Sequence, residues 1–125
     1  MPTAARVAVL SALAALSLVA AWFLAPTALG GSTTYLSTYG TSMEPGFRTG
    51  DLAVLRPAGS YEVGDVVSYL SADLETTVMH RIVDRDGDRF VTQGDNNPWL
   101  DEDRPAAEDL HGALWFSIPQ GGTAL

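Results

Sequence analysis

A long apolar run near the amino terminus is the feature that most limits how this chain can fold. From Val7 to Leu24, eighteen consecutive residues carry no charge. Continued to Leu29, the run has about 23 residues, which as a helix would measure roughly 34 Å and could cross a hydrocarbon core of about 30 Å. We therefore expect residues 1–30 to form a cytoplasmic stub and a transmembrane anchor, and residues 31–125 to form a separate extracytoplasmic domain.

The few positive charges set the expected orientation of this anchor. Arg6 and the free amino group are the only cationic groups before Arg48, and cationic residues beside a span tend to stay in the cytoplasm. We therefore expect a single-pass protein of the cell membrane with a cytoplasmic amino terminus. A cleaved secretory signal is the alternative, because Ala28-Leu29-Gly30 loosely resembles a small-x-small cleavage site. The anchor is favoured, because the run is long for the apolar part of a signal.

The segment beyond the anchor is acidic and has no cysteine. It contains six arginines and fifteen acidic residues, and the whole chain has no lysine. This negative charge argues against binding to nucleic acid and against electrostatic binding to anionic lipid. Without cysteine, the domain has no disulfide to stabilise it, although an extracytoplasmic location would permit one.

Short runs of β-branched and apolar residues, separated by turn signals, predict a mainly β domain. The predicted strands are 52–55, 66–70, 76–83, 89–93 and 112–116. The Asp- and Gly-rich segment 84–88 predicts a tight hairpin turn, and residues 30–34 suggest a flexible exit from the membrane. Short strands at this spacing indicate a small antiparallel β-sheet or barrel-like domain following the one transmembrane helix.

The residues able to carry nucleophilic chemistry are few. Ser42 lies in Ser42-Met43-Glu44-Pro45, beyond the apolar run and flanked by glycines that let the backbone bend. A serine nucleophile needs a base, usually histidine or lysine. Because the chain has no lysine, only His80 and His111 remain. Taken alone, serine before proline is common in turns, and a lone histidine between aliphatic neighbours is more often part of the core.

The position of each histidine separates the two candidates. The two-residue period of a strand places His80 on the same face as Val78 and Ile82. His111 lies in an acidic stretch that we expect to be a solvated loop. An imidazole base also needs an acceptor on its second nitrogen, which Asp95 or Asp101 could supply. Taken alone, the loop that carries them is better explained as an Asx-rich turn.

In their order along the chain, these motifs resemble signal peptidase I. The resemblance covers roughly residues 40–115 and rests on Ser-Met-x-Pro at 42–45, on Met-His-Arg-Ile-Val at 79–83, and on Gly-Asp-Asn-Asn at 94–97 followed by Asp101. Typical bacterial members carry lysine where this chain has His80. The sequence is therefore similar to the serine–histidine branch found in archaea, the endoplasmic reticulum and some Gram-positive bacteria.

This resemblance implies a membrane-bound serine endopeptidase that cleaves signal peptides from exported preproteins after small residues. It needs no metal ion and no nucleotide cofactor. Ser42 would be the nucleophile and His80 the general base. Asp95 and Asp101 match the two important aspartates of the family, and we choose Asp101 as the partner of His80. The partners would be preproteins and the lipid bilayer, with accessory membrane subunits as further candidates and no nucleic acid.

The chain departs from the family pattern beside the nucleophile. Many members have a serine two residues before it, whose hydroxyl is thought to complete the oxyanion hole, whereas this chain has Gly40. The backbone N–H of Ser42 would be one donor to the oxyanion. Thr41 or another backbone N–H could be the second.

Three other functions fit parts of the sequence. A specialised maturation protease on the same scaffold would use the same residues. A catalytically inactive relative that binds preproteins would have no physical need for the whole serine, histidine and aspartate set. A calcium-binding module is suggested by the aspartates of segment 84–88, but the later ligands and the closing glutamate of a calcium loop are missing. A hairpin turn explains that segment better.

Overall fold

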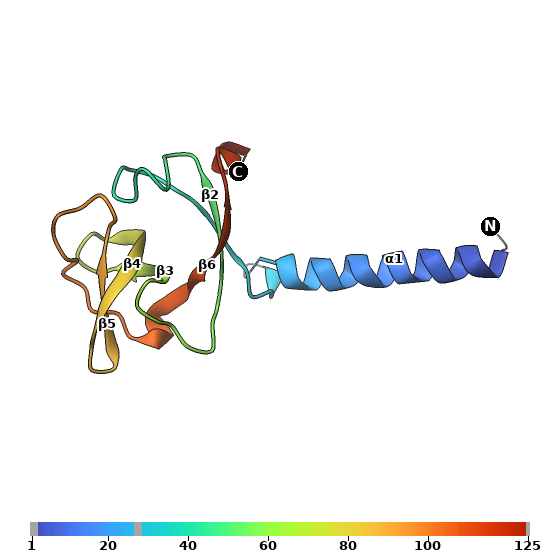
Figure 1. The fold of residues 1–125 in the computed structure, drawn as a ribbon, viewed down its shortest axis with the longest axis horizontal. Coiled ribbons are helices and arrows are strands. Elements are labelled where there is room, and N and C mark those ends of the chain that lie inside the picture. Colours follow the sequence, from blue (N-terminus) through green and yellow to red (C-terminus); the bar gives the residue numbers. More distant parts are fainter. Residues whose placement is uncertain (1–2, 27–28, 125) are drawn as a thin grey trace. The chain divides into compact units, whose positions relative to one another are not determined.

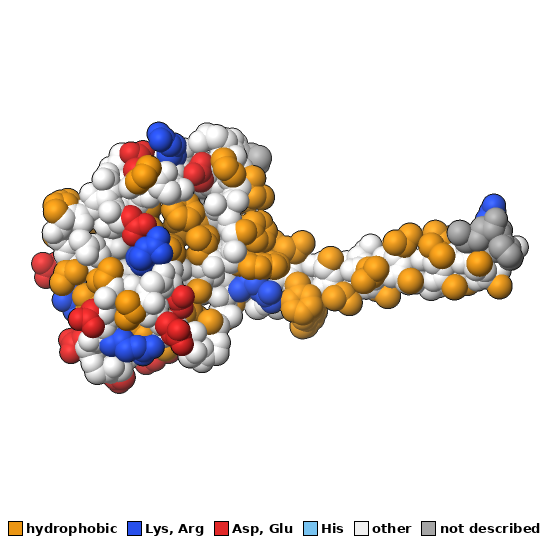
Figure 2. Space-filling view, viewed as in Figure 1, with side chains coloured by type: hydrophobic (Ala, Val, Ile, Leu, Met, Phe, Trp, Pro, Cys, Tyr) orange, Lys and Arg blue, Asp and Glu red, His pale blue; other side chains and the backbone are white. Residues whose placement is uncertain are grey.

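The computed structural model describes residues 3–26 and 29–124 of the chain, which divides into two units at Thr33. The first unit contains the helix α1, Thr3–Leu24, whose most apolar part has a mean hydropathy of 2.4. Apolar side chains lie along its whole length (Figure 2). By length and composition, α1 could cross a membrane. Thr27 and Ala28, part of the predicted extension and of the candidate cleavage site, lie outside the described residues.

The end of α1 follows from local chemistry. Leu24 is the last helical residue, and Pro26 two positions later has no N–H to continue the helix. The hydroxyl of Thr33 donates a hydrogen bond of 2.6 Å to the carbonyl of Phe23, one of the last carbonyls of the helix. The chain therefore turns back on the helix end before the second unit begins.

The second unit is a single six-stranded antiparallel sheet (Figure 1). Its strands are β1 Thr34–Ser37, β2 Leu52–Arg56, β3 Val66–Ser71, β4 Thr76–Asp86, β5 Arg89–Gln93 and β6 Leu110–Ile118, with the short 3-10 helices η2 Ala107–Asp109 and η3 Gly121–Ala124. The strand order is β1-β2-β6-β3-β4-β5, and every pair is antiparallel. The predicted fold class, a mainly β domain after one apolar helix, is confirmed.

The structure corrects two details of the strand prediction. The edge strand β1 begins at Thr34, where a flexible exit was expected, because residues 34–37 pair with β2. Strand β6 begins at Leu110, so the expectation that His111 lies in a loop is wrong, although its side chain is exposed. The predicted hairpin is present: Asp86 pairs with Arg89, and Gly87 in the two-residue turn has a φ of 63°.

The sheet is packed on both faces by two apolar clusters. The first cluster contains Met43, Phe47, Ala53, Leu55, Val66 and Met79. The second contains Tyr61, Val67, Tyr69, Ile82, Phe90 and Leu110. Neighbouring strand residues alternate between the two clusters, as Val66 and Val67 do, because successive side chains of a strand point to opposite faces. The residue after Met79, His80, therefore points away from the first cluster.

Candidate active site

Ser42 lies in a series of turns between β1 and β2. The neighbouring Met43 and, four residues later, Phe47 are both buried in the first apolar cluster. The backbone N–H of Phe47 donates a 3.0 Å hydrogen bond to the carbonyl of Met43, which closes one of these turns. Apolar anchoring on one side of Ser42 therefore fixes the serine on a segment without regular structure.

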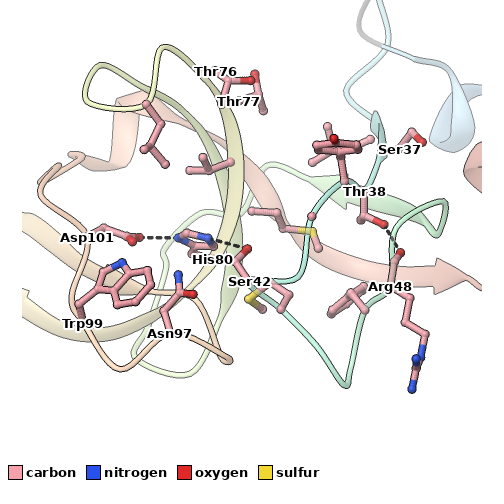
Figure 3. A pocket seen from close by; sticks show the side chains of 18 residues that line it. Ser37, Thr38, Ser42, Arg48, Thr76, Thr77, His80, Asn97, Trp99 and Asp101 are labelled. Carbon is pink, nitrogen blue, oxygen red and sulfur yellow. Dashed lines mark hydrogen bonds and ion pairs between the residues drawn. The ribbon is translucent and has the colours of Figure 1, made fainter.

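Ser42, His80 and Asp101 form a continuous series of hydrogen bonds (Figure 3). The hydroxyl of Ser42 lies 3.1 Å from Nε2 of His80, and Nδ1 of His80 lies 2.6 Å from Oδ2 of Asp101. Because the ionised carboxylate only accepts, Nδ1 carries the proton and the lone pair on Nε2 faces the serine. His80 is only 4% exposed. This arrangement allows the imidazole to take a proton from Ser42.

The carboxylate of Asp101 has two further donors. Its Oδ2 accepts hydrogen bonds from the hydroxyl of Thr92 at 2.7 Å and from the hydroxyl of Tyr69 at 3.2 Å. Burial alone would raise the pKa of Asp101, but the hydrogen bonds from His80, Thr92 and Tyr69, together with the charge of His80, outweigh it and lower this pKa. Burial raises the pKa of Tyr69, so its hydroxyl stays protonated and can donate. Asp101 is therefore held as a carboxylate.

The other predicted aspartate, Asp95, is hydrogen-bonded to a different residue, Arg81. Arg81 donates to it twice, from Nε to Oδ1 at 2.9 Å and from Nη2 to Oδ2 at 2.8 Å. These hydrogen bonds lower the pKa of Asp95. His80 and Arg81 are consecutive residues of β4 and point to opposite faces. The structure therefore brings together Ser42, His80 and Asp101, and places Asp95 on the neighbouring arginine.

The loop that follows β5 is hydrogen-bonded to the segment that carries Ser42. The backbone N–H of Asn96 donates to the carbonyl of Ser42 at 2.8 Å, and the Asn96 side chain donates to the carbonyl of Thr41 at 3.0 Å. Gly94 is packed against the same segment, since a Cβ at this position would lie 2.8 Å from the carbonyl oxygen of Ser42. The loop therefore requires glycine here, and it locks the position of the serine.

A pocket of about 470 Å³ opens beside these residues. It is lined by residues 36–40, in β1 and just after it, and by residues 76–80, the first half of β4. Strand β1 is at one end of the sheet order, and within the described chain β4 pairs with β5 only over residues 81–86. Two strand segments with unpaired edges thus border the pocket, together with Ser42, His80 and Asp101.

The backbone conformation explains why the chain has glycine, and not serine, two positions before Ser42. Gly40 has a φ of 89°, a backbone conformation that residues with a side chain rarely adopt. This accounts for glycine at this position. The backbone N–H of Ser42 has no hydrogen-bond partner among the residues that the structure describes.

Sequence reasoning did not identify Tyr69 and Thr92. Both lie in predicted strands, but their meeting with Asp101 joins residues that are far apart in the chain. Only the strand order of the sheet brings them together, and no local pattern encodes that order. The polar character of the two positions was no usable signal, because β3 also contains Ser68 and Ser71, and β5 begins with Arg89 and ends with Gln93.

Comparison with known protein families finds one match over most of the chain. The model of the family described as Peptidase S24-like matches residues 7–111. This range contains Ser42, His80 and Asp101. No curated protein matches the chain.

Proposed function

Because the chain belongs to the Peptidase S24-like family, we propose that it is a membrane-anchored serine endopeptidase that removes signal peptides from exported preproteins after small residues. The observation that carries this proposal is the hydrogen-bonded series of Ser42, His80 and Asp101 beside a pocket. The family supports a serine peptidase. The resemblance of the sequence to signal peptidase I supports the choice of substrate.

In the proposed reaction His80 acts first as a base. Its Nε2 takes the hydroxyl proton of Ser42 while the serine oxygen bonds to the carbonyl carbon of the scissile peptide. Asp101 stabilises the imidazolium through the Nδ1–H. The negative oxygen of the tetrahedral intermediate accepts a hydrogen bond from the backbone N–H of Ser42, and such a donor accelerates acyl transfer by about 10²–10³.

The reaction then completes in two steps. The imidazolium of His80 gives its Nε2 proton to the departing amine as the peptide C–N bond breaks, which leaves an acyl ester on Ser42. A water molecule next loses a proton to Nε2 and attacks the ester carbon. When the ester bond breaks, the proton returns to the oxygen of Ser42. The enzyme is regenerated without any cofactor.

The two unpaired strand edges beside the pocket support an extended substrate. A chain lying between residues 36–40 and residues 76–80 could hydrogen-bond to both through its backbone, whatever its sequence. Selection would then depend on the side chains next to the cut. Leu36, Phe47 and Val78 line the pocket with apolar surface, which suits a small side chain such as that of alanine.

Membrane attachment places the enzyme near its substrates. With α1 spanning the cell membrane and the amino terminus in the cytoplasm, the sheet domain lies on the extracytoplasmic side, where signal peptides emerge. Confinement to the same bilayer raises the effective concentration of membrane-bound preproteins. Preproteins and the bilayer are then the partners of this chain, and accessory membrane subunits are further candidates.

The test is cleavage of a model preprotein by membranes carrying the full chain. The substrate has alanine at the first and third positions before the cut, and a control substrate has phenylalanine at both. We expect cleavage of the first substrate only, and loss of nearly all activity in Ser42→Ala and His80→Ala. The His111→Gln variant, which changes an exposed histidine outside the site, should cut normally.

Three outcomes would contradict the proposal. Unchanged activity in His80→Ala would refute the serine–histidine mechanism. Cleavage of a single precursor, at a site without small residues, would indicate a specialised maturation protease. Binding of preproteins without any cleavage would indicate an inactive relative.

A further inference from the structure

The hydrogen-bonded series at the site extends beyond Asp101. The hydroxyls of Thr92 and Tyr69 lie 3.0 Å apart, and both contact the carboxylate oxygen that accepts the Nδ1–H of His80. Thr92 has one hydroxyl proton, and at 2.7 Å it donates this proton to Asp101. Tyr69 therefore donates to Thr92 or to Asp101. One carboxylate oxygen thus receives up to three donors.

Both hydroxyl groups lie in the interior of the sheet domain. Thr92 is 0% exposed and Tyr69 is 2% exposed. Tyr69 belongs to β3 and Thr92 to β5, and β4, which carries His80, runs between these two strands. Two strands therefore support Asp101 from positions on either side of the strand that holds the histidine.

Burial of these hydroxyls is hard to explain by packing alone. Valine and phenylalanine would fill nearly the same volumes as Thr92 and Tyr69 without the cost of burying polar groups, and such replacements are often neutral or stabilising. A buried carboxylate, in contrast, needs donors for its lone pairs. The side chain of Asp101 is only 9% exposed. The need of the Asp101 carboxylate for hydrogen-bond donors therefore explains why these two hydroxyls are buried here.

We infer that Thr92 and Tyr69 are positioning residues of the active site, which fix the orientation of the Asp101 carboxylate and share its charge. The inference rests on the proposed function. Held by Thr92 and Tyr69, the carboxylate keeps one oxygen on Nδ1 of His80, and His80 keeps Nε2 on Ser42. The shared charge also limits how strongly Asp101 stabilises the imidazolium.

The test uses four variants of the full chain. Thr92→Val removes the hydroxyl without changing the shape, and Thr92→Ser restores a hydroxyl at the same place. Tyr69→Phe removes the phenolic oxygen alone. The matched control is Ser68→Ala, because Ser68 is next to Tyr69 on β3 and 0% exposed, and within the described chain its hydroxyl has no hydrogen-bond partner.

The first readout is the pH dependence of kcat/KM for the model preprotein. Loss of one hydrogen bond to a buried charged group corresponds to about a tenfold change or more. We expect the plateau in Thr92→Val to fall about tenfold, mainly in kcat, and the acid limb to move to higher pH. Tyr69→Phe should show the same direction and a smaller effect. Thr92→Ser and Ser68→Ala should match the wild type in both respects.

The second readout does not depend on catalysis. The proton between Nδ1 of His80 and Asp101 can be followed as a low-field NMR signal, identified by its loss in His80→Gln. With one donor removed, more carboxylate charge faces this proton, so the signal should move downfield in Thr92→Val and return in Thr92→Ser. A chain that cuts nothing but shows this movement would refute the proposed function and leave the positioning role intact.

Unchanged pH profiles and an unmoved signal in both Thr92→Val and Tyr69→Phe would overturn the inference. An equal effect of Ser68→Ala would overturn it too, because the loss would then reflect general packing. A rise in KM with unchanged kcat would assign the two residues to substrate binding and would likewise contradict a role through Asp101.

Discussion

Two side-chain pairs start from consecutive residues of β4 and differ in burial and in chemistry. His80 with Asp101 and Arg81 with Asp95 both join a residue of β4 to an aspartate of the loop after β5. In the first pair the side chains are 5% and 9% exposed, and in the second they are 39% and 30% exposed. One pair faces the interior and the pocket, and the other faces solvent.

The difference shows how one short motif serves two purposes. A guanidinium is always charged, so the Arg81 pair can hold the loop in place but cannot exchange a proton with a substrate. An imidazole can gain and lose a proton near neutral pH. His80 is buried, and in the part of the chain that the structure describes the carboxylate hydrogen-bonded to it is that of Asp101. Because a strand alternates its side chains, consecutive residues separate these roles without further structure. The predictions below test this separation, beginning with the largest expected effect.

The largest effect should come from Asp101→Asn. An asparagine can donate to Nδ1 of His80 and so leave the proton on Nε2, where it blocks attack by Ser42. In serine proteases the corresponding change lowers kcat by about 10⁴ with the geometry intact. We expect a fall of about 10³ or more in kcat, measured on the model preprotein, with little change in KM. The matched change Asp95→Asn should lower kcat by no more than about tenfold, since the Asp95 carboxylate is bound by Arg81 and, among the described residues, has no hydrogen bond to Ser42 or His80.

Equal losses in the two variants would contradict this comparison. They would mean that the loop after β5 acts as one rigid unit in which either aspartate is indispensable. Circular dichroism of both variants would show whether the sheet is intact, so that loss of fold is separated from loss of chemistry.

Local patterns could predict the strands but not the pairing of distant residues. The alternation of Val78, His80 and Ile82 in β4 indicated which face His80 occupies, and the glycine and aspartate residues indicated the hairpin. The family resemblance indicated Asp95 and Asp101 alike, and naming Asp101 as the partner of His80 was a choice between them, because a spacing of a few residues in a loop does not decide which carboxylate turns inward.

The parts that could not be predicted depend on strand order. Tyr69 and Thr92 meet at Asp101 because β3, β4 and β5 are neighbours with a particular register. The short strand β1 forms because β2 offers an edge to residues 34–37, although their own sequence follows a glycine-rich segment. Both features arise from contacts between segments far apart in the chain.

An intermediate effect should come from Gly94→Ala. Gly94 is at the start of the loop that carries both aspartates, and a Cβ there would lie 2.7 Å from Nδ2 of Asn97 and 2.8 Å from the carbonyl oxygen of Ser42. The Asn97 side chain can move, but the backbone of Ser42 must shift. A displacement of about 1 Å at a nucleophile can lower the rate about 10²-fold. The expected result is such a loss in kcat with an unchanged fold.

A matched control for this change is Gly59→Ala, since a Cβ at Gly59 meets nothing within 4 Å. The control should keep full activity. Wild-type kcat in Gly94→Ala would show that the loop does not fix Ser42. The two aspartates could then not be compared as parts of one loop that positions the serine.

The smallest effect concerns the stability contributed by the exposed pair. The hydrogen bonds from Arg81 lower the pKa of Asp95 below its usual value of 3.8. The folded state therefore binds this proton less readily than the unfolded state does, so the contribution is complete above pH 3.8 and is lost as the pH falls below it. Exposed ion pairs contribute about 0.2–1 kcal/mol. At pH 7 the free energy of unfolding of Asp95→Asn should thus be lower than that of the wild type by less than about 1 kcal/mol.

The decisive measurement for this pair is denaturant unfolding of the full chain in detergent at several pH values. A protonated aspartate and an asparagine are both neutral, so the difference between wild type and Asp95→Asn should shrink as the pH is lowered through 3.8. A difference that stays constant down to low pH would mean that Asp95 acts through packing, not through its charge. A difference well above 1 kcal/mol at pH 7 would mean that Asp95 contributes more to the stability of the fold than an exposed ion pair does. Either result would remove the contrast between the two pairs.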